Sequence, residues 1–181
     1  MNKSTVTRTL TATIAAFLLI SNSMSAAPDL SFAFEGDAEK RKRLKELQGQ
    51  TAPKLDVSKW ENSDQLDLAS LKGKIVVLDF WATWCGPCIG SIPKNNKIHE
   101  KYQDQVVFIG ICHPDGADKM KDVIQSEGIK YPVVIDDKGK TIDAYEVNGY
   151  PDYYIIDREG KIVVADCSNS KVDAALQKLL E

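Results

Sequence analysis

Histidine and cysteine are scarce in this chain of 181 residues, which contains two histidines and four cysteines. A zinc site built from two pairs of ligands would need a second close pair of cysteines or histidines besides Cys85 and Cys88. None exists, since His99 and His113 are far apart, so we expect no bound metal. Positive charge is not in excess either, because 23 lysines and arginines face 26 aspartates and glutamates, for a net charge of -3. A nucleic-acid-binding domain would carry a strongly basic surface, and we expect no nucleic-acid partner.

A long apolar run is also missing from the N-terminal region. The apolar, threonine-containing stretch at residues 10–20 is too short for a membrane span, which needs about 20 residues. Lys3 and Arg8 are the only charges of the first 27 residues, and small polar residues follow the apolar stretch. This order predicts a secretory signal peptide over residues 1–27. An amphipathic surface helix or an uncleaved membrane anchor is the alternative. We therefore expect an exported, periplasmic or otherwise extracytoplasmic protein.

Residues 28–50 contain few large apolar side chains. Between positions 37 and 48 only Leu44 and Leu47 are large and apolar, and most other positions are charged. So little apolar surface does not drive a core, and the segment is predicted to be a polar extension, either a solvated helix or a flexible chain. Its basic cluster at residues 40–43 is typical of a solvated helix face, with contact to an acidic partner or lipid headgroups as the alternative.

The remaining residues, 51–181, alternate between strand and helix patterns. The continuous apolar run at 75–81 is typical of a strand buried on both faces of a sheet. Alternation between residues 55 and 68 predicts a short N-terminal hairpin, and residues 158–160 predict a hairpin turn. Further strands are predicted at 106–112, 131–136, 153–157 and 161–166, and helices at 85–102, 115–127, 140–145 and 170–180. This order predicts one α/β domain with a central mixed β-sheet flanked by helices.

Two of the cysteines, Cys85 and Cys88, are separated by two residues at the junction between the predicted central strand and the next helix. Unpaired N–H groups and the positive dipole end of a helix N-terminus favour the thiolate of the first cysteine and lower its pKa. We therefore expect Cys85 to be an exposed nucleophile and Cys88 to resolve the mixed disulfide that it forms. Half of a zinc site would need a second ligand pair, and a structural disulfide in so tight a loop would constrain the unfolded chain little.

The residues around this pair, Trp-Cys-Gly-Pro-Cys at 84–88 after Asp-Phe-Trp-Ala at 79–82, resemble the active-site segment of the thioredoxin superfamily. The resemblance covers about residues 51–181 and implies a thioredoxin fold. The predicted leader, the N-terminal hairpin and a helix–strand insertion at about 113–145 make the chain similar to the exported TlpA/ResA-like and cytochrome c maturation branch.

Three positions outside the motif carry the resemblance further. Pro93, five residues after Cys88, stands where the family has a helix-kinking proline. Asp79 stands where thioredoxins have a buried carboxylate beneath the second cysteine. The resemblance implies that Asp79 accepts a proton from Cys88, and desolvation in an apolar strand would raise the pKa of this carboxyl. A carboxylate hydrogen-bonded to the backbone at a strand end is the alternative reading of the residue.

The same resemblance implies a substrate groove around the cysteines. Pro151 stands where the family has a cis-proline, which would present the backbone of Tyr150 to an extended peptide. Trp84, Gly86 and Pro87 complete the predicted substrate-binding set, and the last two also influence the redox poise of the cysteine pair.

The chain departs from the family at several positions. Ser91 stands where many exported relatives carry an acidic residue, which leaves Asp79 as the better candidate for proton transfer. Asp152 replaces a small hydroxyl residue after the cis-proline and is expected to give the groove an acidic edge. Cys112 and Cys167 are predicted at strand ends about 14 Å apart. They are read as buried free cysteines, with a second disulfide or an auxiliary thiol relay as the alternatives.

These residues together predict an exported thiol–disulfide oxidoreductase that works by dithiol–disulfide exchange, as a reductase rather than an oxidase of exported proteins. Cytochrome c maturation is one pathway in which it would serve. No cofactor is expected, because the electrons reside in the cysteine pair. The expected partners are exported proteins with thiols or disulfides and a membrane thiol-redox donor, and the protein is expected to be a monomer. A thiol peroxidase and a non-catalytic periplasmic chaperone or binding module are the alternatives.

Overall fold

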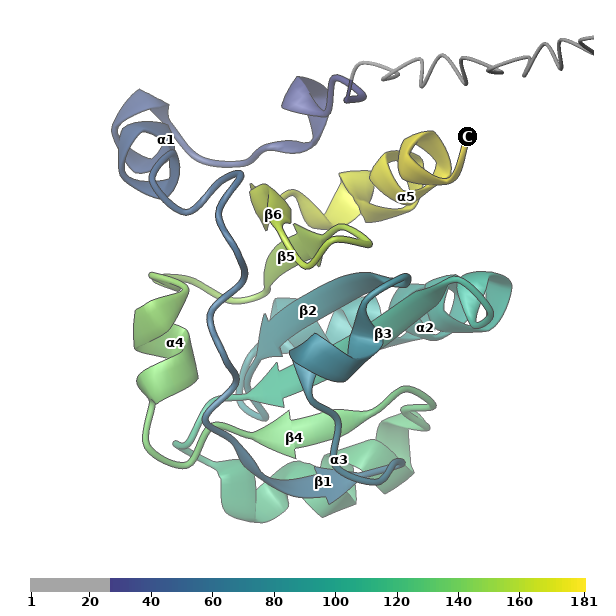
Figure 1. The fold of residues 1–181 in the computed structure, drawn as a ribbon. Coiled ribbons are helices and arrows are strands. Elements are labelled where there is room, and N and C mark those ends of the chain that lie inside the picture. Colours follow the sequence, from purple (N-terminus) through teal and green to yellow (C-terminus); the bar gives the residue numbers. More distant parts are fainter. Residues whose placement is uncertain (1–26) are drawn as a thin grey trace, which may run out of the picture.

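The computed structural model describes residues 27–181, so the predicted signal peptide, apart from its last residue, lies outside the described residues (Figure 1). The strands are β1 (Ser58–Glu61), β2 (Ile75–Trp81), β3 (Val106–Cys112), β4 (Val133–Ile135), β5 (Asp152–Ile156) and β6 (Ile162–Cys167). The α-helices are α1 (Ala38–Leu44), α2 (Gly86–Tyr102), α3 (Met120–Glu127), α4 (Lys140–Ala144) and α5 (Val172–Leu180). Short 3-10 helices are η1 (Ser31–Ala33), η2 (Leu68–Leu71), η3 (Ala117–Lys119) and η4 (Asn169–Lys171). Within 27–181, none of the helices has the length and apolar character that crossing a membrane requires.

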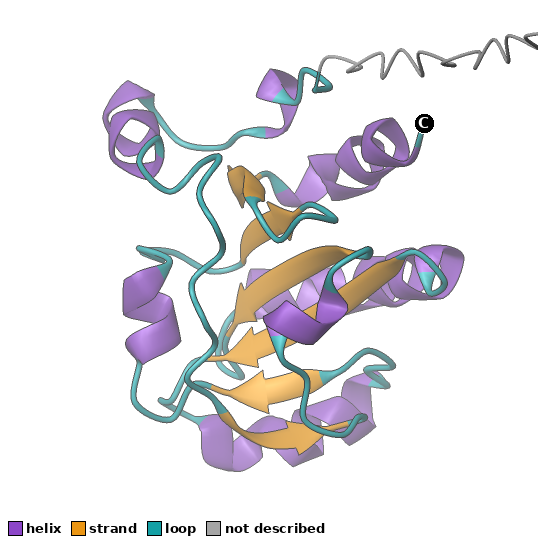
Figure 2. Ribbon diagram, in the orientation of Figure 1, coloured by secondary structure: helices purple, strands orange, loops and turns teal. Residues whose placement is uncertain are grey.

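The six strands, orange in Figure 2, form one mixed sheet in the order β1-β4-β3-β2-β5-β6, which the labels of Figure 1 identify. The pairs β2–β3 and β3–β4 are parallel, whereas β1–β4, β2–β5 and β5–β6 are antiparallel. All seven residues of β2 are buried, as the continuous apolar run at 75–81 predicts for a central strand. The mixed α/β sheet flanked by helices is therefore confirmed, and so is the hairpin that joins β5 to β6.

Side chains alternate between the two faces of the sheet and build two apolar cores. The first core, which contains Val77 and Trp81 of β2, is covered by residues of α2, α3 and α5. The second, which contains Val76, Leu78 and Phe80, is covered by residues of α4 and by Leu44 of α1. Consecutive residues of β2 thus point to opposite cores, and Asp79 falls on the face that α2 covers.

The N-terminal hairpin expected between residues 55 and 68 is not formed. Only residues 58–61 make a strand, and β1 pairs with β4, to which it is antiparallel. The second arm is replaced by η2, whose first N–H groups are capped when the Asp67 side chain accepts the N–H of Ala69 at 3.1 Å. The alternation of Leu66 and Leu68 reflects packing against the second core and not pairing with β1.

The extension at residues 28–50 is partly helical and lies beside β6 (Figure 1). Phe34 forms an isolated antiparallel bridge with Cys167, and Leu44 is only 2% exposed. Arg41 donates from Nη2 to Oδ2 of Asp166 at 2.9 Å and from Nη1 to the carbonyl of Ala165 at 3.0 Å. The helical alternative is therefore the one found. Lys40 and Arg41 of its basic cluster bind the buried carboxylate of Asp166, whereas Lys42 and Arg43 are exposed, as a solvated helix face predicts.

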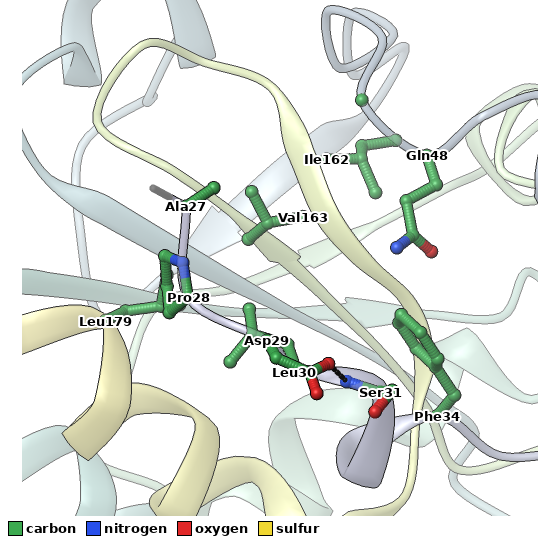
Figure 3. A pocket seen from close by; sticks show the side chains of 11 residues that line it. Ala27, Pro28, Asp29, Leu30, Ser31, Phe34, Gln48, Ile162, Val163 and Leu179 are labelled. Carbon is green, nitrogen blue, oxygen red and sulfur yellow. Dashed lines mark hydrogen bonds between the residues drawn. The ribbon is translucent and has the colours of Figure 1, made fainter. Parts of the chain in front are cut away.

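A small pocket remains between this extension and the body of the protein (Figure 3). Its volume is about 320 Å³, and its walls come from the start of the extension, from Ile162 and Val163 of β6 and from Leu179 of α5. Asp29 lines it and accepts the N–H of Ser31 at 2.9 Å. Neither Cys85 nor Cys88 belongs to its lining.

Candidate active site

Cys85 and Cys88 form a disulfide at the N-terminus of α2, with an S–S distance of 2.11 Å. Cys85 is the N-cap residue of the helix, and its Sγ accepts the backbone N–H of Cys88 at 3.2 Å. A helix N-terminus stabilises negative charge, so in the reduced protein this position favours the thiolate of Cys85. Gly86 and Pro87 occupy the first two helical positions, where a proline needs no backbone partner.

The two sulfur-bearing residues are almost equally buried, which differs from the expectation of an exposed Cys85. Cys85 is 5% exposed and Cys88 is 3% exposed. The exposed residues are the two between them, Gly86 and Pro87, because they form the outward first turn of the helix. The helix N-terminus, and not solvent exposure, therefore distinguishes Cys85 from Cys88 in the oxidised protein.

The loop before the disulfide is fastened to the segment that follows β3. Thr83 donates from Oγ1 to the carbonyl of Gly116 at 2.8 Å, and Trp84 donates from Nε1 to the carbonyl of Asp115 at 3.0 Å. Gly116 has a φ of +80° and allows this close approach, since an added Cβ would lie 2.6 Å from Thr83 Oγ1. Trp84 is thereby held in place although its side chain is 59% exposed.

Three aromatic rings surround the exposed side of this loop. The ring of Trp84 lies 5.8 Å from that of His113 and 5.9 Å from that of Tyr150, and the last two lie 5.4 Å apart. Each pair is arranged edge to face, a favourable geometry for aromatic rings. The Tyr150–Pro151 peptide bond is cis, as the resemblance predicts. The structure thus brings the predicted groove residues Trp84, Tyr150 and Pro151 to one side of the molecule.

Asp79 is buried beneath α2, with 3% exposure. Its Oδ2 accepts the side-chain amide of Asn95 at 2.9 Å, and its Oδ1 has no partner among the described residues. Burial raises the pKa of Asp79 to about 7, and the Asn95 amide and the hydroxyls of Tyr153 and Tyr131 lower it by less. The predicted rise in pKa by desolvation is confirmed, and the backbone-bonded alternative for this carboxylate is not found.

Further polar side chains lie along the buried face of α2. Ser91 donates from Oγ to the carbonyl of Pro87 at 2.8 Å and accepts the amide of Asn169 at 2.6 Å. Asn95, one turn further, also donates to Oη of Tyr153 at 3.0 Å. Ser91 is neutral, so Asp79 is the carboxylate that lies beneath this face of α2. The helix continues unbroken through Pro93, which is exposed.

Asp152 does not form the acidic edge of a groove, contrary to the sequence-based expectation. The residue is 2% exposed, and both carboxyl oxygens lack a hydrogen-bond partner among residues 27–181. It neighbours Tyr153 in β5, and adjacent strand residues point to opposite faces, so Asp152 faces away from α2. Burial and the nearby charge of Asp166 raise the pKa of Asp152 to about 8.

Cys112 and Cys167 lie at the ends of β3 and β6, as predicted, and both are buried free cysteines. Three strand spacings separate β3 from β6 in the sheet, so Cys112 and Cys167 are too far apart to form a disulfide with each other. Burial raises the pKa of each thiol to about 12. The reading as packed, unreactive cysteines is the one that the structure supports.

Sequence reasoning assigned no role to Asn95 or His113, which the structure brings into the site region. Asn95 lies seven residues after Cys88, a spacing that returns to the same helix face. The sequence signal for Asn95 is a polar residue on the helix face that also carries Cys88 and is therefore buried. His113 reaches Trp84 and Tyr150 only through the fold, because no local pattern connects the end of β3 to these residues.

The mixed sheet, with its disulfide at the N-terminus of α2, defines the chain as a thioredoxin-fold thiol–disulfide oxidoreductase. Comparison with known proteins supports this assignment. The profile of the AhpC/TSA family matches residues 48–165, and the chain belongs to this family.

Individual relatives point the same way. Thiol-disulfide oxidoreductase ResA of Bacillus thuringiensis (strain Al Hakam) is 34% identical over 135 residues, which are 72% of this chain and 78% of that protein. Thioredoxin-like protein YneN of Bacillus subtilis (strain 168) is 34% identical over 118 residues, 64% of this chain and 68% of its own length. A thioredoxin family thiol:disulfide interchange protein from Chlorobium tepidum TLS has a similar crystal structure, with a TM-score of 0.62 and 26% identity over 74% of this chain and 98% of that one.

Proposed function

We propose that this protein is an exported reductase that transfers two electrons from the Cys85–Cys88 dithiol to disulfides of other exported proteins. The observation that carries the proposal is the Cys85–Cys88 disulfide at the N-terminus of α2, with an ionisable buried carboxyl, Asp79, on the sheet below the same helix. The bonded pair is the product state of such a reaction. No cofactor is needed, since both electrons reside on sulfur.

The first step is attack by the Cys85 thiolate on one sulfur of the substrate disulfide. A bond forms between Cys85 and that sulfur, the substrate disulfide breaks, and the other substrate sulfur leaves as a thiolate. The Cys88 N–H, which points to Sγ of Cys85 at 3.2 Å, stabilises the negative charge of the attacking sulfur.

The second step resolves the mixed disulfide. Asp79 accepts the proton of the Cys88 thiol, and the resulting thiolate attacks Cys85, which reforms the Cys85–Cys88 disulfide and releases the second substrate sulfur. A base with a pKa of about 7 suits this task near neutral pH, because it is partly ionised and still basic enough to take the proton. A membrane thiol-redox donor then returns two electrons and two protons to the pair.

The substrate is an extended peptide segment that carries a disulfide. Trp84 offers an exposed apolar surface beside the pair, and the backbone of Tyr150 before the cis-Pro151 supplies a strand-like edge for pairing. Gly86 and Pro87 leave the approach to the sulfurs open because their own side chains are small. A c-type apocytochrome, with its Cys-x-x-Cys-His segment, is a suitable test substrate.

Two measurements test the proposal. The reduction potential of Cys85–Cys88 is expected near that of thioredoxin, about −270 mV, whereas a value near −120 mV would assign the opposite direction of electron flow. The Cys88→Ser variant is expected to accumulate a mixed disulfide between Cys85 and a peptide disulfide, and the Cys85→Ser variant is expected to form none. Full activity of Cys85→Ser in protecting an unfolded protein from aggregation, without turnover in the wild type, would favour a chaperone instead.

A further inference from the structure

Asn95 is an unusual residue for the place it occupies. It lies on the buried face of α2, at 1% exposure, between the apolar core residues Ile92 and Ile98. Burying a side-chain amide is unfavourable unless its polar atoms find partners. The position on the helix is that of Cys88 two turns earlier, since residues seven apart share one face. A polar group at this place therefore needs a reason beyond packing.

The contacts of Asn95 join the two strands beneath the helix. Its Nδ2 donates one hydrogen to Oδ2 of Asp79 at 2.9 Å and the other to Oη of Tyr153 at 3.0 Å. Asp79 on β2 and Tyr153 on β5 are register partners across the antiparallel pair. The amide nitrogen faces Asp79, because an amide oxygen would be repelled by the ionised carboxylate, and the amide Oδ1 has no hydrogen-bond partner among the described residues. A single amide group thus uses both of its hydrogens at this site.

We propose that Asn95 is a positioning residue for thiol–disulfide exchange, which fixes the Asp79 carboxylate through Oδ2 and leaves Oδ1 to exchange the proton of Cys88. The inference rests on the proposed role of Asp79 as the proton acceptor. Oδ1 fits the second part of this role because it has no hydrogen-bond partner among the described residues. Tyr153 shares the same amide group and so helps to hold its orientation.

The chemistry of the contact gives the direction of the effect. An N–H group that donates to a carboxylate stabilises its ionised form and opposes the rise in pKa that burial causes. The groups that act on Asp79 are Asn95 from α2, Tyr153 from β5 and Tyr131 from the segment before β4, and none of those found among residues 27–181 is a cation. Loss of the Asn95 donor is therefore not offset by a positive charge, and the pKa of Asp79 should rise further.

The test replaces Asn95 by leucine, which has a similar shape and no donor. In the oxidised, ¹³C-aspartate-labelled protein, we expect the Asp79 carboxyl to titrate about one pKa unit higher than in the wild type. The Asp79 signal is assigned by its absence from Asp79→Asn. In the reduced protein, the rate at saturating peptide disulfide should fall about tenfold at pH 6, with its pH profile displaced upward by the same amount. Asn95→Ser, which is too short to reach Asp79, is the second variant if leucine prevents folding.

Ser91→Ala is the matched control, because Ser91 lies on the same helix face and bonds Pro87 and Asn169 but not Asp79. It should leave the Asp79 titration in place. An unchanged Asp79 titration in both Asn95 variants would overturn the proposal. A displaced titration with an unchanged pH profile would overturn it as well. In that case a wild-type resolution rate in Asp79→Asn would trace the failure to the proposed base and not to Asn95.

Discussion

Tyr153 lies directly opposite Asp79 in the antiparallel pairing of β5 with β2, on the face of the sheet that α2 covers. The pairing brings a phenol and a carboxylate, 74 positions apart in the sequence, to the same amide of Asn95. Burial raises the pKa of Asp79 and of Tyr153, and the charge of Asp79 raises the pKa of Tyr153 further. The redox site is thus built on a buried polar cluster whose ionisation depends on pH.

Asp79 should make the stability of the oxidised protein depend on pH. Its pKa is about 7 in the folded protein against 3.8 ordinarily, so between about pH 4 and pH 7 the folded state keeps a proton that the unfolded chain has lost. Stability therefore falls as the pH rises through this window. Asp79→Asn removes this contribution, and at pH 8 we expect the variant to be more stable than the wild type by about 4 kcal/mol.

Urea unfolding at pH 4 and pH 8 measures this effect, with little difference between the two proteins expected at pH 4. Asp152→Asn is the comparison variant, because the pKa of Asp152 is also raised, to about 8, by burial and by Asp166. Each variant should remove part of the decline with pH. A wild-type free energy of unfolding that is constant from pH 4 to pH 8 would show that neither carboxyl is protonated in the folded state.

Arg41 should contribute to stability through its contact with Asp166, although it belongs to the N-terminal extension. The Asp166 side chain is 4% exposed and is bound by Arg41 and Lys40, each at 2.9 Å. Arg41→Met leaves a buried carboxylate with one cation, and we expect a loss of about 2 kcal/mol in the free energy of unfolding. Lys42→Met, an exposed neighbour in the same helix, is the control and should change it by less than about 0.5 kcal/mol.

A double-mutant cycle separates the ion pair from other effects of Arg41. If the pair carries the loss, Arg41→Met should cost much less when Asp166 is already asparagine. Equal costs in both backgrounds would instead assign the effect to the packing of the Arg41 guanidinium, which lies 5.1 Å from the centre of the Phe34 ring.

Gly116 should be needed to hold the loop that carries Trp84. Alanine at this position would place a Cβ 2.6 Å from Thr83 Oγ1 and 3.2 Å from Trp84, and it would adopt a φ of +80°. We expect Gly116→Ala to lose about 2 kcal/mol and to displace the NMR signal of the Trp84 indole N–H, which donates to Asp115.

Gly128→Ala provides the control for backbone strain. Gly128 also has a positive φ, of +64°, but apart from its own chain neighbours no atom of residues 27–181 lies within 4 Å of an added Cβ. It should cost only about 1 kcal/mol and leave the indole signal of Trp84 in place. Equal losses in the two variants, with unmoved indole signals, would show that the contact between the two loops does not position Trp84.

Cys112 and Cys167 should not react with thiol reagents in the folded protein. Both are buried, and pKa values of about 12 leave roughly one thiolate in ten thousand at pH 8. Oxidised protein should therefore release almost no colour from a disulfide reagent such as Ellman's within minutes, and two thiols should appear in denaturant. Rapid native labelling at either cysteine, identified by mass spectrometry, would revive the thiol-relay alternative.

Several features could be predicted because they depend on neighbours in the sequence. The apolar run of β2 and the Cys85–Cys88 spacing define a strand, a helix N-terminus and a redox pair within fourteen residues. The N-terminal hairpin was predicted wrongly for a related reason. Alternation shows that residues 55–68 have a buried side, but it does not say which strand pairs with β1, and β4 is far along the chain.

The sequence by itself determined the reaction class, since two cysteines at a strand–helix junction are sufficient to place a reactive sulfur at a helix N-terminus. The tertiary structure alone decided what surrounds this pair. It places Tyr153 and Asn95 next to each other and to Asp79. It also places Asp152 on the opposite face, near Asp166, and brings Arg41 of the extension into contact with Asp166. The physical reason is that local patterns fix an element and its buried side, whereas the partner of a buried polar group is chosen by which distant elements pack there.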